Sequence, residues 1–193
     1  KGTTMKLNIV IPMAGKGSRF TEAGYTFPKP LIPVADKTMI EVVTNNLKVR
    51  DIDHKFIFIC QKEHTEKYDV FNVLKRATNN NFEIITINGI TKGAACTVLT
   101  AIDHINSDDD LLIANSDQLV ELDMTGFVLD GRQGKRDGLI MTFESTHPKW
   151  SFVSLDTDGN VLEAAEKMVI SNRATVGIYY FKRGKDFVDA AIG

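Results

Sequence analysis

The turn at residues 14–19, Ala-Gly-Lys-Gly-Ser-Arg, has the composition of an anion-binding site. Small residues let successive backbone N–H groups face outward and form a concave nest for an anion. In this turn they are Ala14, Gly15, Gly17 and Ser18. Arg19 adds a planar fork of N–H donors that fits phosphate oxygens. The turn follows the apolar run at residues 7–13, whose length and Ile and Val content predict a buried strand of a parallel sheet.

Lys29 is a further candidate for phosphate chemistry, because it lies between Pro28 and Pro30. The two prolines restrict the backbone, so the ammonium group is held in a nearly constant direction. A strand, a glycine turn, an arginine and a restrained lysine together predict a triphosphate site. The Gly-x-Gly pair alone is weak evidence, and the alternative for it is an ordinary turn.

Neither of the two common phosphate motifs is present in this turn. A dinucleotide fingerprint needs a third glycine at its sixth position, where the chain has Phe20. A P-loop needs Gly-Lys-Ser or Gly-Lys-Thr after a four-residue spacer, and the sequence contains none. The turn therefore predicts a phosphate site of a different kind.

Asp117 is the best candidate for a magnesium ligand. It lies just beyond the apolar run at residues 111–114, which is predicted to be a buried parallel strand. Ligands of open α/β sheets bind at the carboxyl ends of such strands, and Mg²⁺ is usually held by one or two carboxylates together with substrate phosphates. The alternative is an aspartate that only ends a strand in a turn.

The string from residue 7 to residue 30, with its Pro-Lys-Pro segment, resembles the signature of the sugar-nucleotidyltransferase family. That family contains the pyrophosphorylases that make nucleotide-diphosphate sugars, and related cytidylyltransferases. The resemblance implies that the glycine turn and Arg19 hold a nucleoside triphosphate, while Lys29 stabilises charge at the reacting phosphate. Arg19 and Lys29 are therefore the expected catalytic residues, and Mg²⁺ is the expected cofactor.

The resemblance extends to a corner that would bind the nucleobase. A polar loop begins at Asn88 and ends at Gly93, and a helix with small residues, beginning Gly93-Ala94, follows it. In the family the matching corner recognises the base through an amide side chain and backbone groups near the glycine. Asn88, Gly93 and Ala94 are the expected counterparts, with an ordinary strand–helix connection as the alternative. A short amide suits a pyrimidine, and CTP is slightly preferred over TTP or UTP.

The resemblance also covers an acceptor region. In the family a glutamate and a glycine contact the acceptor, and a lysine contacts its phosphate. The matching positions are Trp150, Glu166, Lys167 and Gly177. The implied reaction transfers a nucleoside monophosphate to a phosphorylated small molecule and releases pyrophosphate, in surface polysaccharide biosynthesis. The acceptor is a sugar 1-phosphate, or a phosphorylated polyol or amino acid.

Two other functions stay open. The family takes a second metal-binding aspartate from a later segment, and no residue of this sequence matches it. A regulatory module that binds nucleotide without turnover is therefore one alternative. The other is a glycosyltransferase of related architecture, whose Asp-x-Asp metal motif occurs only at residues 108–110 and 156–158. Neither lies at the carboxyl end of a predicted parallel strand, and residues 108–110 read as a solvated acidic loop.

The elements that must position these residues alternate along the chain. Strands are expected at residues 55–60, 82–87, 111–114, 138–143, 152–155, 161–164 and 175–181. Helices are expected from the capping box at residues 38–41, at residues 63–76, from residue 93 and at residues 184–192. The pattern predicts a three-layer αβα, Rossmann-like domain with a mostly parallel mixed sheet. Its nucleotide half lies at about residues 5–125 and its smaller β acceptor half at about residues 138–181.

Composition supports one globular domain: 193 residues, of which 43% are hydrophobic and 25% charged. A net charge of −2 favours neither a nucleic-acid partner nor an anionic membrane. No apolar run approaches the ~20 residues of a membrane span, and residues 1–4 resemble a cloning remnant. Cys60 and Cys96 are expected to be buried reduced thiols, which together with the absence of a visible signal peptide suggests a cytoplasmic protein.

Overall fold

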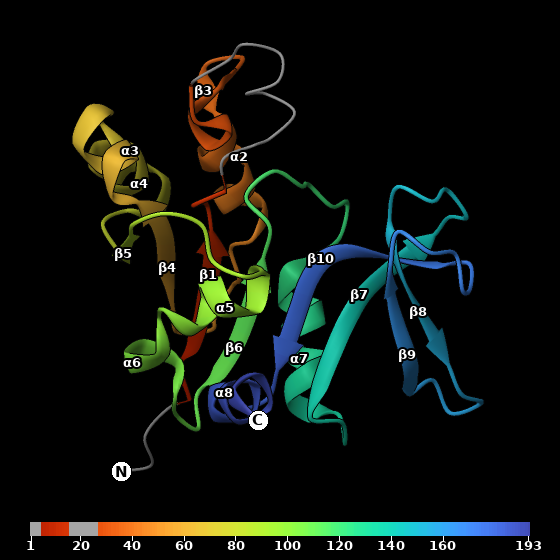
Figure 1. Ribbon diagram of the computed structural model, residues 1–193. Coiled ribbons are helices and arrows are strands. Elements are labelled where there is room, and N and C mark those ends of the chain that lie inside the picture. The colour runs from red at the N-terminus through yellow and green to blue at the C-terminus, as the bar shows by residue number, and fades with distance from the viewer. Residues whose placement is uncertain (1–4, 16–26) are drawn as a thin grey trace.

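A computed structural model describes residues 5–15 and 27–193 of the chain. Its centre is a parallel sheet in which β1 is flanked by β4 and β6, and β5 pairs with β4. These strands are β1 (Leu7–Pro12), β4 (His54–Gln61), β5 (Phe82–Ile87) and β6 (Asp110–Ala114). The order β5-β4-β1-β6 means that the chain first builds the sheet to one side of β1 and then returns to the other side (Figure 1).

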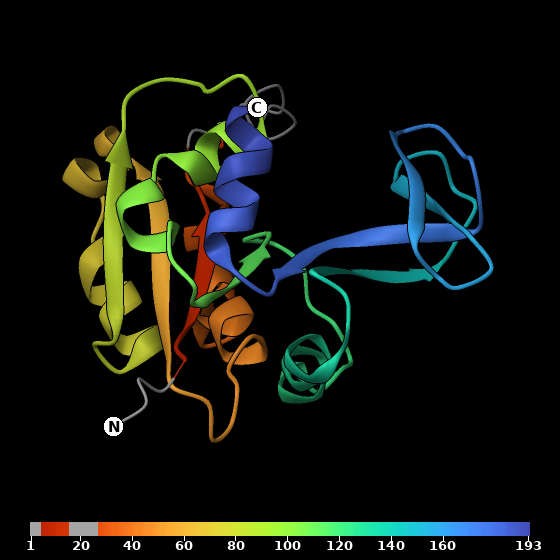
Figure 2. The ribbon, with the colours of Figure 1, turned by 90° about the horizontal axis from the view of Figure 1, so that it is seen from below.

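The same sheet continues beyond β6 through antiparallel strands. They are β10 (Arg173–Phe181), β7 (Gly138–Glu144), β8 (Ser151–Leu155) and β9 (Val161–Glu166). β10 pairs with β6 and with β7, and it touches β8, which pairs with β9. Figure 2 shows the β8–β9 hairpin at the far end of the long β7–β10 ribbon, away from the parallel strands. The predicted mixed, mostly parallel sheet is therefore confirmed.

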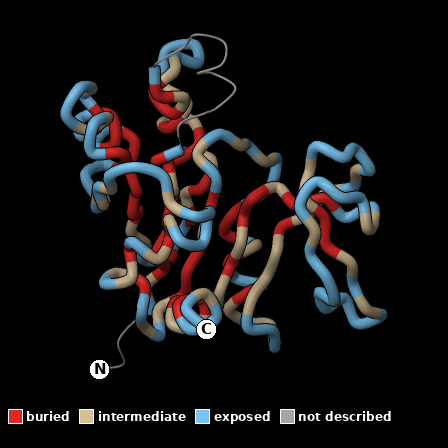
Figure 3. Tube along the Cα trace, in the orientation of Figure 1, coloured by how far each residue is buried: buried red, intermediate tan, exposed pale blue. Residues whose placement is uncertain are grey.

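Helices cover both faces of the parallel strands and give the expected three layers. One apolar cluster contains residues of α2 (Met39–Asn46), α4 (Val70–Thr78) and α7 (Met124–Gln133). The second contains residues of α5 (Ala94–Leu99), α6 (Ile102–Ile105) and α8 (Gly184–Ile192). In β1, Ile9 belongs to the first cluster and Val10 to the second, as the two-residue period of a strand requires. The buried residues follow these central strands (Figure 3).

Several local predictions are confirmed in detail. Thr38 and Glu41 form the capping box of α2, in which the Thr38 side chain accepts from the Glu41 N–H. The β8–β9 hairpin turns at residues 156–160, where Gly159 has φ +79° and the Asp156 carboxylate accepts backbone N–H groups. The short elements η1 (Lys29–Leu31), β2 (Pro33–Val34) and β3 (Lys37–Thr38) lead into α2. No helix in the described ranges is long and apolar enough to cross a bilayer.

The structure corrects two predictions about helices. The single helix expected at residues 63–76 is two helices, α3 (Lys62–Lys67) and α4, because Tyr68 leaves the helical conformation and its ring packs edge-on against Phe27. The apolar pattern of residues 63–76 predicts that Phe71 faces inward, but its side chain is 57% exposed.

Cys96 is exposed rather than buried. It precedes the buried Val98 by two positions on α5 and therefore lies on the opposite side of that helix. Cys60, in β4, is buried as expected.

Candidate active site

The order of the parallel strands reverses between β1 and β6, and ligands of open α/β sheets bind at such a point. A cleft of about 180 Å³ lies at the carboxyl ends of these two strands. It is lined by Pro12, Met13, Gly15, Lys29, Pro30, Asn115, Ser116 and Asp117. The fold therefore brings together the glycine turn, the Pro-Lys-Pro segment and the strand-end aspartate. Gly17, Ser18 and Arg19 lie outside the described residues.

Lys29 and Asp117 form a direct ion pair in this cleft. The Lys29 Nζ donates to Asp117 Oδ2 at 2.5 Å, although the two residues are 88 positions apart in the chain. Both side chains are partly open to solvent, with exposures of 39% and 34%. Lys29 begins η1 between the buried residues Pro28 and Pro30, so its backbone is anchored. A lysine ammonium thus occupies the place where Asp117 could hold another cation.

Gln61 is a site residue that sequence reasoning missed. At the end of β4 its buried amide donates to the Ala14 carbonyl at 2.7 Å and to the Gly89 carbonyl at 2.8 Å. Gly89 follows Asn88 in the predicted base loop and has φ +79°. One side chain therefore ties the start of the phosphate turn to the base loop. The sequence did contain a signal for this role, because Gln61 is a polar residue directly after the apolar strand predicted at residues 55–60.

The predicted base corner is built as a strand, a loop and a helix start. Asn88 directly follows β5, and Gly93 is the N-cap residue of α5, which Ala94 begins. All three residues are exposed. The Gly93 carbonyl accepts from the N–H and the hydroxyl of Thr97, which secures the first turn. Because Gln61 joins this loop to the glycine turn, the corner adjoins the cleft.

A second, larger hollow adjoins Asp117. This cavity, the Trp150 pocket, has a volume of about 570 Å³. It is lined by Asp117, Gln118, Leu119, Val120, Glu121, Leu122, Met141, Thr142, Phe143, Trp150 and Val176. The ring of Trp150 meets that of Phe143 edge-on, with 5.2 Å between centroids. Trp150, predicted from the acceptor region, therefore shares a pocket with the predicted metal ligand.

Gly177 supports the cleft through Asn115. It sits at an irregularity of β10 with φ +81°, and a Cβ added to it would lie 1.9 Å from Asn115 Nδ2. The Asn115 N–H also donates to the Gly177 carbonyl at 3.1 Å. The close approach that a glycine within a strand indicates is thus made by Asn115, a residue of the cleft.

Glu166 and Lys167 are not brought into either hollow beside Asp117. Glu166 lines a separate small cavity near Thr175 and Tyr179. Both side chains are strongly exposed, and the Lys167 Nζ lies 3.8 Å from Glu166 Oε1. Lys167, with φ +53°, is connected to the Trp150 pocket through its backbone, because its N–H donates to the Trp150 carbonyl at 3.1 Å.

The acidic run at residues 108–110 is only partly the solvated loop predicted from the sequence. Asp110 begins β6 and is fully buried. Its carboxylate accepts two hydrogen bonds from Arg132, at 2.6 and 2.9 Å, and one from the Tyr180 hydroxyl at 3.0 Å. These bonds compensate the charge that burial would otherwise penalise. The hydrogen bond with Asp110 raises the pKa of Arg132.

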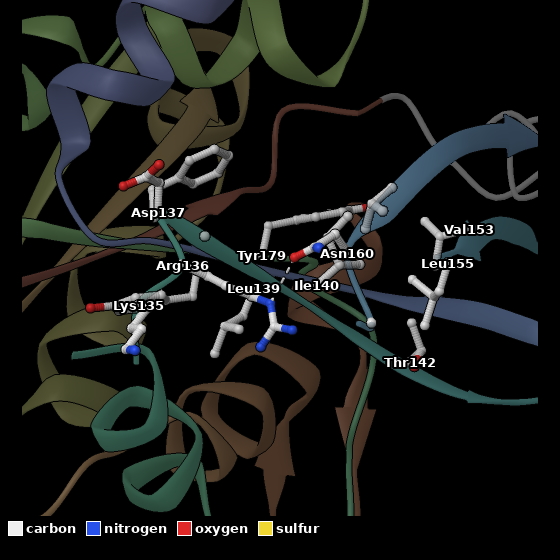
Figure 4. A pocket seen from close by; sticks show the side chains of 15 residues that line it. Lys135, Arg136, Asp137, Leu139, Ile140, Thr142, Val153, Leu155, Asn160 and Tyr179 are labelled. Atoms are coloured by element: carbon white, nitrogen blue, oxygen red, sulfur yellow. Dashed lines mark hydrogen bonds between the residues drawn. The ribbon is translucent and has the colours of Figure 1, made fainter. Parts of the chain in front are cut away.

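A further cavity of about 750 Å³ is distant from this chemistry. It lies between the first part of β7 and the β8–β9 hairpin, where Arg136 donates to the Asn160 side chain (Figure 4). Because Gly138 pairs with Phe181, and Phe181 with Leu111, this region adjoins the start of β6. None of the predicted site residues within the described ranges lines it.

Comparison with known proteins identifies the family. The model of the family described as Nucleotidyl transferase matches residues 9–190, so the chain belongs to that family. A curated relative is the bifunctional protein GlmU of Methanocaldococcus jannaschii, 29% identical over 92% of this chain and 40% of the relative. Another is the low-salt glycan biosynthesis nucleotidyltransferase Agl11 of Haloferax volcanii, which is 28% identical over 89% of this chain and 48% of the relative. The chain thus spans less than half the length of these two relatives.

Solved structures agree on the fold. A nucleoside-diphosphate-sugar pyrophosphorylase from Vibrio cholerae is 27% identical, with a TM-score of 0.74 over 94% of this chain and 76% of that one. HddC from Yersinia pseudotuberculosis, solved in complex with GMP-PN, has a TM-score of 0.73 over 94% of this chain and 79% of that one. Its sequence identity is 19%, so this likeness supports the fold alone.

Proposed function

We propose that this protein transfers a nucleoside monophosphate from a nucleoside triphosphate to a phosphorylated small-molecule acceptor. An acceptor phosphate oxygen attacks the α-phosphorus in line, the bond to the β-phosphate bridging oxygen breaks, and pyrophosphate leaves. The observation that carries this proposal is the Lys29–Asp117 pair beside Gly15, at the sheet's reversal point. Such a reaction needs no covalent protein nucleophile, only positioning and neutralisation of charge.

The residues have separate roles in this proposal. The glycine turn and Arg19 bind the triphosphate, and Asn88, Gly93 and Ala94 contact the base. Lys29 neutralises the charge that grows on the α-phosphoryl group in the transition state. Trp150 lines the acceptor site, and Gly177 keeps the space for Asn115. Glu166 and Lys167 remain predicted ligands of the acceptor. Because both side chains lie outside the two hollows beside Asp117, the β8–β9 hairpin would have to move for them to contact an acceptor bound there.

Magnesium fits the donor set of the cleft. Asp117 offers one carboxylate that already attracts a cation, and the neighbouring Asn115 and Ser116 offer neutral oxygens. When bound, Mg²⁺ would be held by Asp117 and would act as a Lewis acid that withdraws negative charge from the reacting phosphate. In the part of the chain that the structure describes, no three His, Cys, Asp or Glu residues form a metal cluster. Substrate phosphates would therefore complete the coordination.

Release of pyrophosphate is the direct test. The protein is incubated with Mg²⁺, each of CTP, UTP, TTP, ATP and GTP, and a panel of sugar 1-phosphates, polyol phosphates and phosphorylated amino acids. We expect turnover with a pyrimidine nucleotide, CTP first. Release with ATP or GTP alone would contradict the pyrimidine assignment. Nucleotide binding without turnover for any acceptor would favour the regulatory module instead, which the single described carboxylate of the cleft supports.

The two Asp-x-Asp segments that the glycosyltransferase alternative requires as metal ligands lie away from the cleft. Asp110 is buried against Arg132, and Asp156 organises the turn of the β8–β9 hairpin. Neither aspartate lines the cleft at the end of β6.

A further inference from the structure

The loop that carries Asp117 has little packing of its own. Residues 115–123 connect β6 to α7 and form neither helix nor strand. The two leucines of this loop are 54% and 50% exposed. The loop is tied to β10 at its first residue, where the Asn115 N–H donates to the Gly177 carbonyl. Because Asp117 lies two positions further on, its carboxylate is fixed only if the loop is held again on its other side.

Asn46, the last residue of α2, holds the loop on that side. Its Nδ2 donates to the Val120 carbonyl at 2.9 Å, and the Val120 N–H donates to Asn46 Oδ1 at 3.0 Å. One side-chain amide thus pairs with both backbone groups of a residue 74 positions away. The Val120 side chain also packs against the first apolar cluster. The loop is therefore anchored at most about 10 Å beyond Asp117, since three extended residues reach no further.

The other end of α2 holds the Pro-Lys-Pro segment. The N–H of Met39, the first residue of α2, donates to the Ile32 carbonyl at 2.9 Å, and the Ile32 N–H donates to the Lys29 carbonyl at 3.1 Å. Leu31 of this segment is buried in the same apolar cluster as Ile40 of α2. One short helix therefore supports both members of the ion pair in the cleft, one at each of its ends.

We propose that Asn46 is a positioning residue, which fixes Val120 and thereby keeps Asp117 turned toward Lys29. Asn46 lines neither the cleft nor the Trp150 pocket, so it acts only through the loop. The consequence for nucleotide and metal rests on the proposed function, because Asp117 is there the residue that holds Mg²⁺. The hydrogen-bond geometry itself is independent of that function.

Hydrogen exchange, followed by NMR on the intact protein without nucleotide, tests the anchor directly. Asn46→Leu keeps the shape of the side chain but can neither donate nor accept, so both Val120 backbone groups lose their partner. We expect the Val120 amide to exchange at least about tenfold faster and the Asp117 amide to change its chemical shift. The matched control is Asn45→Leu, because Asn45 is exposed on the same helix. Unchanged exchange at Val120 and an unchanged Asp117 signal would refute the inference.

Nucleotide affinity with and without Mg²⁺ tests whether the anchor serves the cleft. The nucleoside triphosphate that binds best is titrated calorimetrically in Mg²⁺ and in EDTA. In Mg²⁺ we expect Asn46→Leu to bind it about tenfold more weakly than the unmodified chain. In EDTA the two proteins should be nearly equal, because neither the glycine turn nor the base loop depends on Asn46. Losses of equal size in both conditions would indicate a general effect on the fold and contradict the positioning role.

A double-mutant cycle identifies the residue through which Asn46 acts. If that residue is Asp117, adding Asn46→Leu to Asp117→Asn should change the affinity in Mg²⁺ by less than about twofold. Fully additive losses would show that Asn46 acts elsewhere, and the assignment to Asp117 would be wrong.

Kinetics separate positioning from binding. At saturating substrates and Mg²⁺, Asn46→Leu should lower kcat by about ten- to a hundredfold with a smaller change in the KM of the acceptor, since a small displacement of a reacting group has effects of this size. Asn45→Leu should keep its kcat. A normal kcat for Asn46→Leu would overturn the inference while the proposed function stands. An unmodified protein that binds no nucleotide, or never turns over, refutes the proposed function, and hydrogen exchange then decides the inference alone.

Discussion

The two ends of strand β6 each carry an aspartate paired with a cation, but in opposite environments. At the start of the strand, Asp110 is fully buried and Arg132 is 18% exposed. At the far end, the side chains of Asp117 and Lys29 are about one third exposed. The first pair is bidentate and is completed by the Tyr180 hydroxyl. The second joins a loop and a short 3-10 turn by a single contact.

This difference indicates what each pair can do. A buried carboxylate with three donors cannot exchange its partners, because any unpaired intermediate would leave a charge in the interior. A half-exposed pair contributes only about 0–1 kcal/mol and is easily replaced by other ions. The start of β6 is therefore suited to holding the sheet against α7 and β10, and its end to exchanging one cation for another as substrates arrive.

Replacing Asp110 should give the largest effect on stability. Asp110→Asn leaves Arg132 buried without its counter-charge, which costs about 3–5 kcal/mol. For a chain of this length, the loss corresponds to a melting temperature lower by on the order of 10 °C. Thermal unfolding followed by circular dichroism measures it. The matched variant Asp117→Asn should shift melting by at most a few degrees, and equal losses for the two variants would remove the contrast between the ends of β6.

Replacing Lys29 should give the largest effect on activity. Because the charge on the α-phosphoryl group grows in the transition state, Lys29→Ala should lower kcat by about 10²–10³ and weaken nucleotide binding much less. Pyrophosphate release and nucleotide titration measure the two quantities. Lys37→Ala, in the exposed strand β3, is the control. Near-normal turnover of Lys29→Ala would show that the Pro-Lys-Pro segment has been misassigned.

Replacing Gln61 should test how the phosphate turn and the base loop are held together beside the cleft. Gln61→Met has a similar length but donates no hydrogen bond, so the Ala14 and Gly89 carbonyls lose their shared donor. We expect the KM for nucleotide to rise about tenfold with a smaller change in kcat, since a lost buried hydrogen bond costs about 1–3 kcal/mol. Gln133→Met, exposed at the end of α7, serves for comparison. An unchanged KM would mean that the two loops hold their positions without this amide.

The smallest predicted effect is a loss of stability at alkaline pH, caused by Tyr180 beside Asp110 at the start of β6. Burial, and then the neighbouring Asp110 carboxylate, raise the pKa of Tyr180. In the unfolded chain the phenol ionises near about pH 10. Its contribution to stability is therefore complete below that pH and is lost as pH rises toward the higher folded pKa. Tyr180→Phe should unfold with a flatter pH dependence between about pH 9 and 11. Identical slopes for the two proteins would contradict this role.

Much of the fold was predictable because the responsible interactions are local. The strand formed by the apolar run at residues 7–12 and the capping box at Thr38 depend on neighbours within a few positions. The same holds for the hairpin turn at residues 156–160 and for α8, whose predicted bounds of 184–192 are confirmed. The break between α3 and α4 was missed because it depends on the contact of Tyr68 with Phe27, which is distant in the chain.

For the candidate site, the sequence by itself determined which residues have the right chemistry: Lys29 from its flanking prolines, and Asp117 from its place after an apolar run. Only the tertiary structure decided that these two meet at 2.5 Å, that Gln61 joins two loops, and that Asp110 is buried while Asp108 is not. Neighbouring aspartates look alike in a sequence, and their environments differ because Asp110 begins β6 and pairs with Leu7 of β1, whereas Asp108 lies in the exposed loop before that strand.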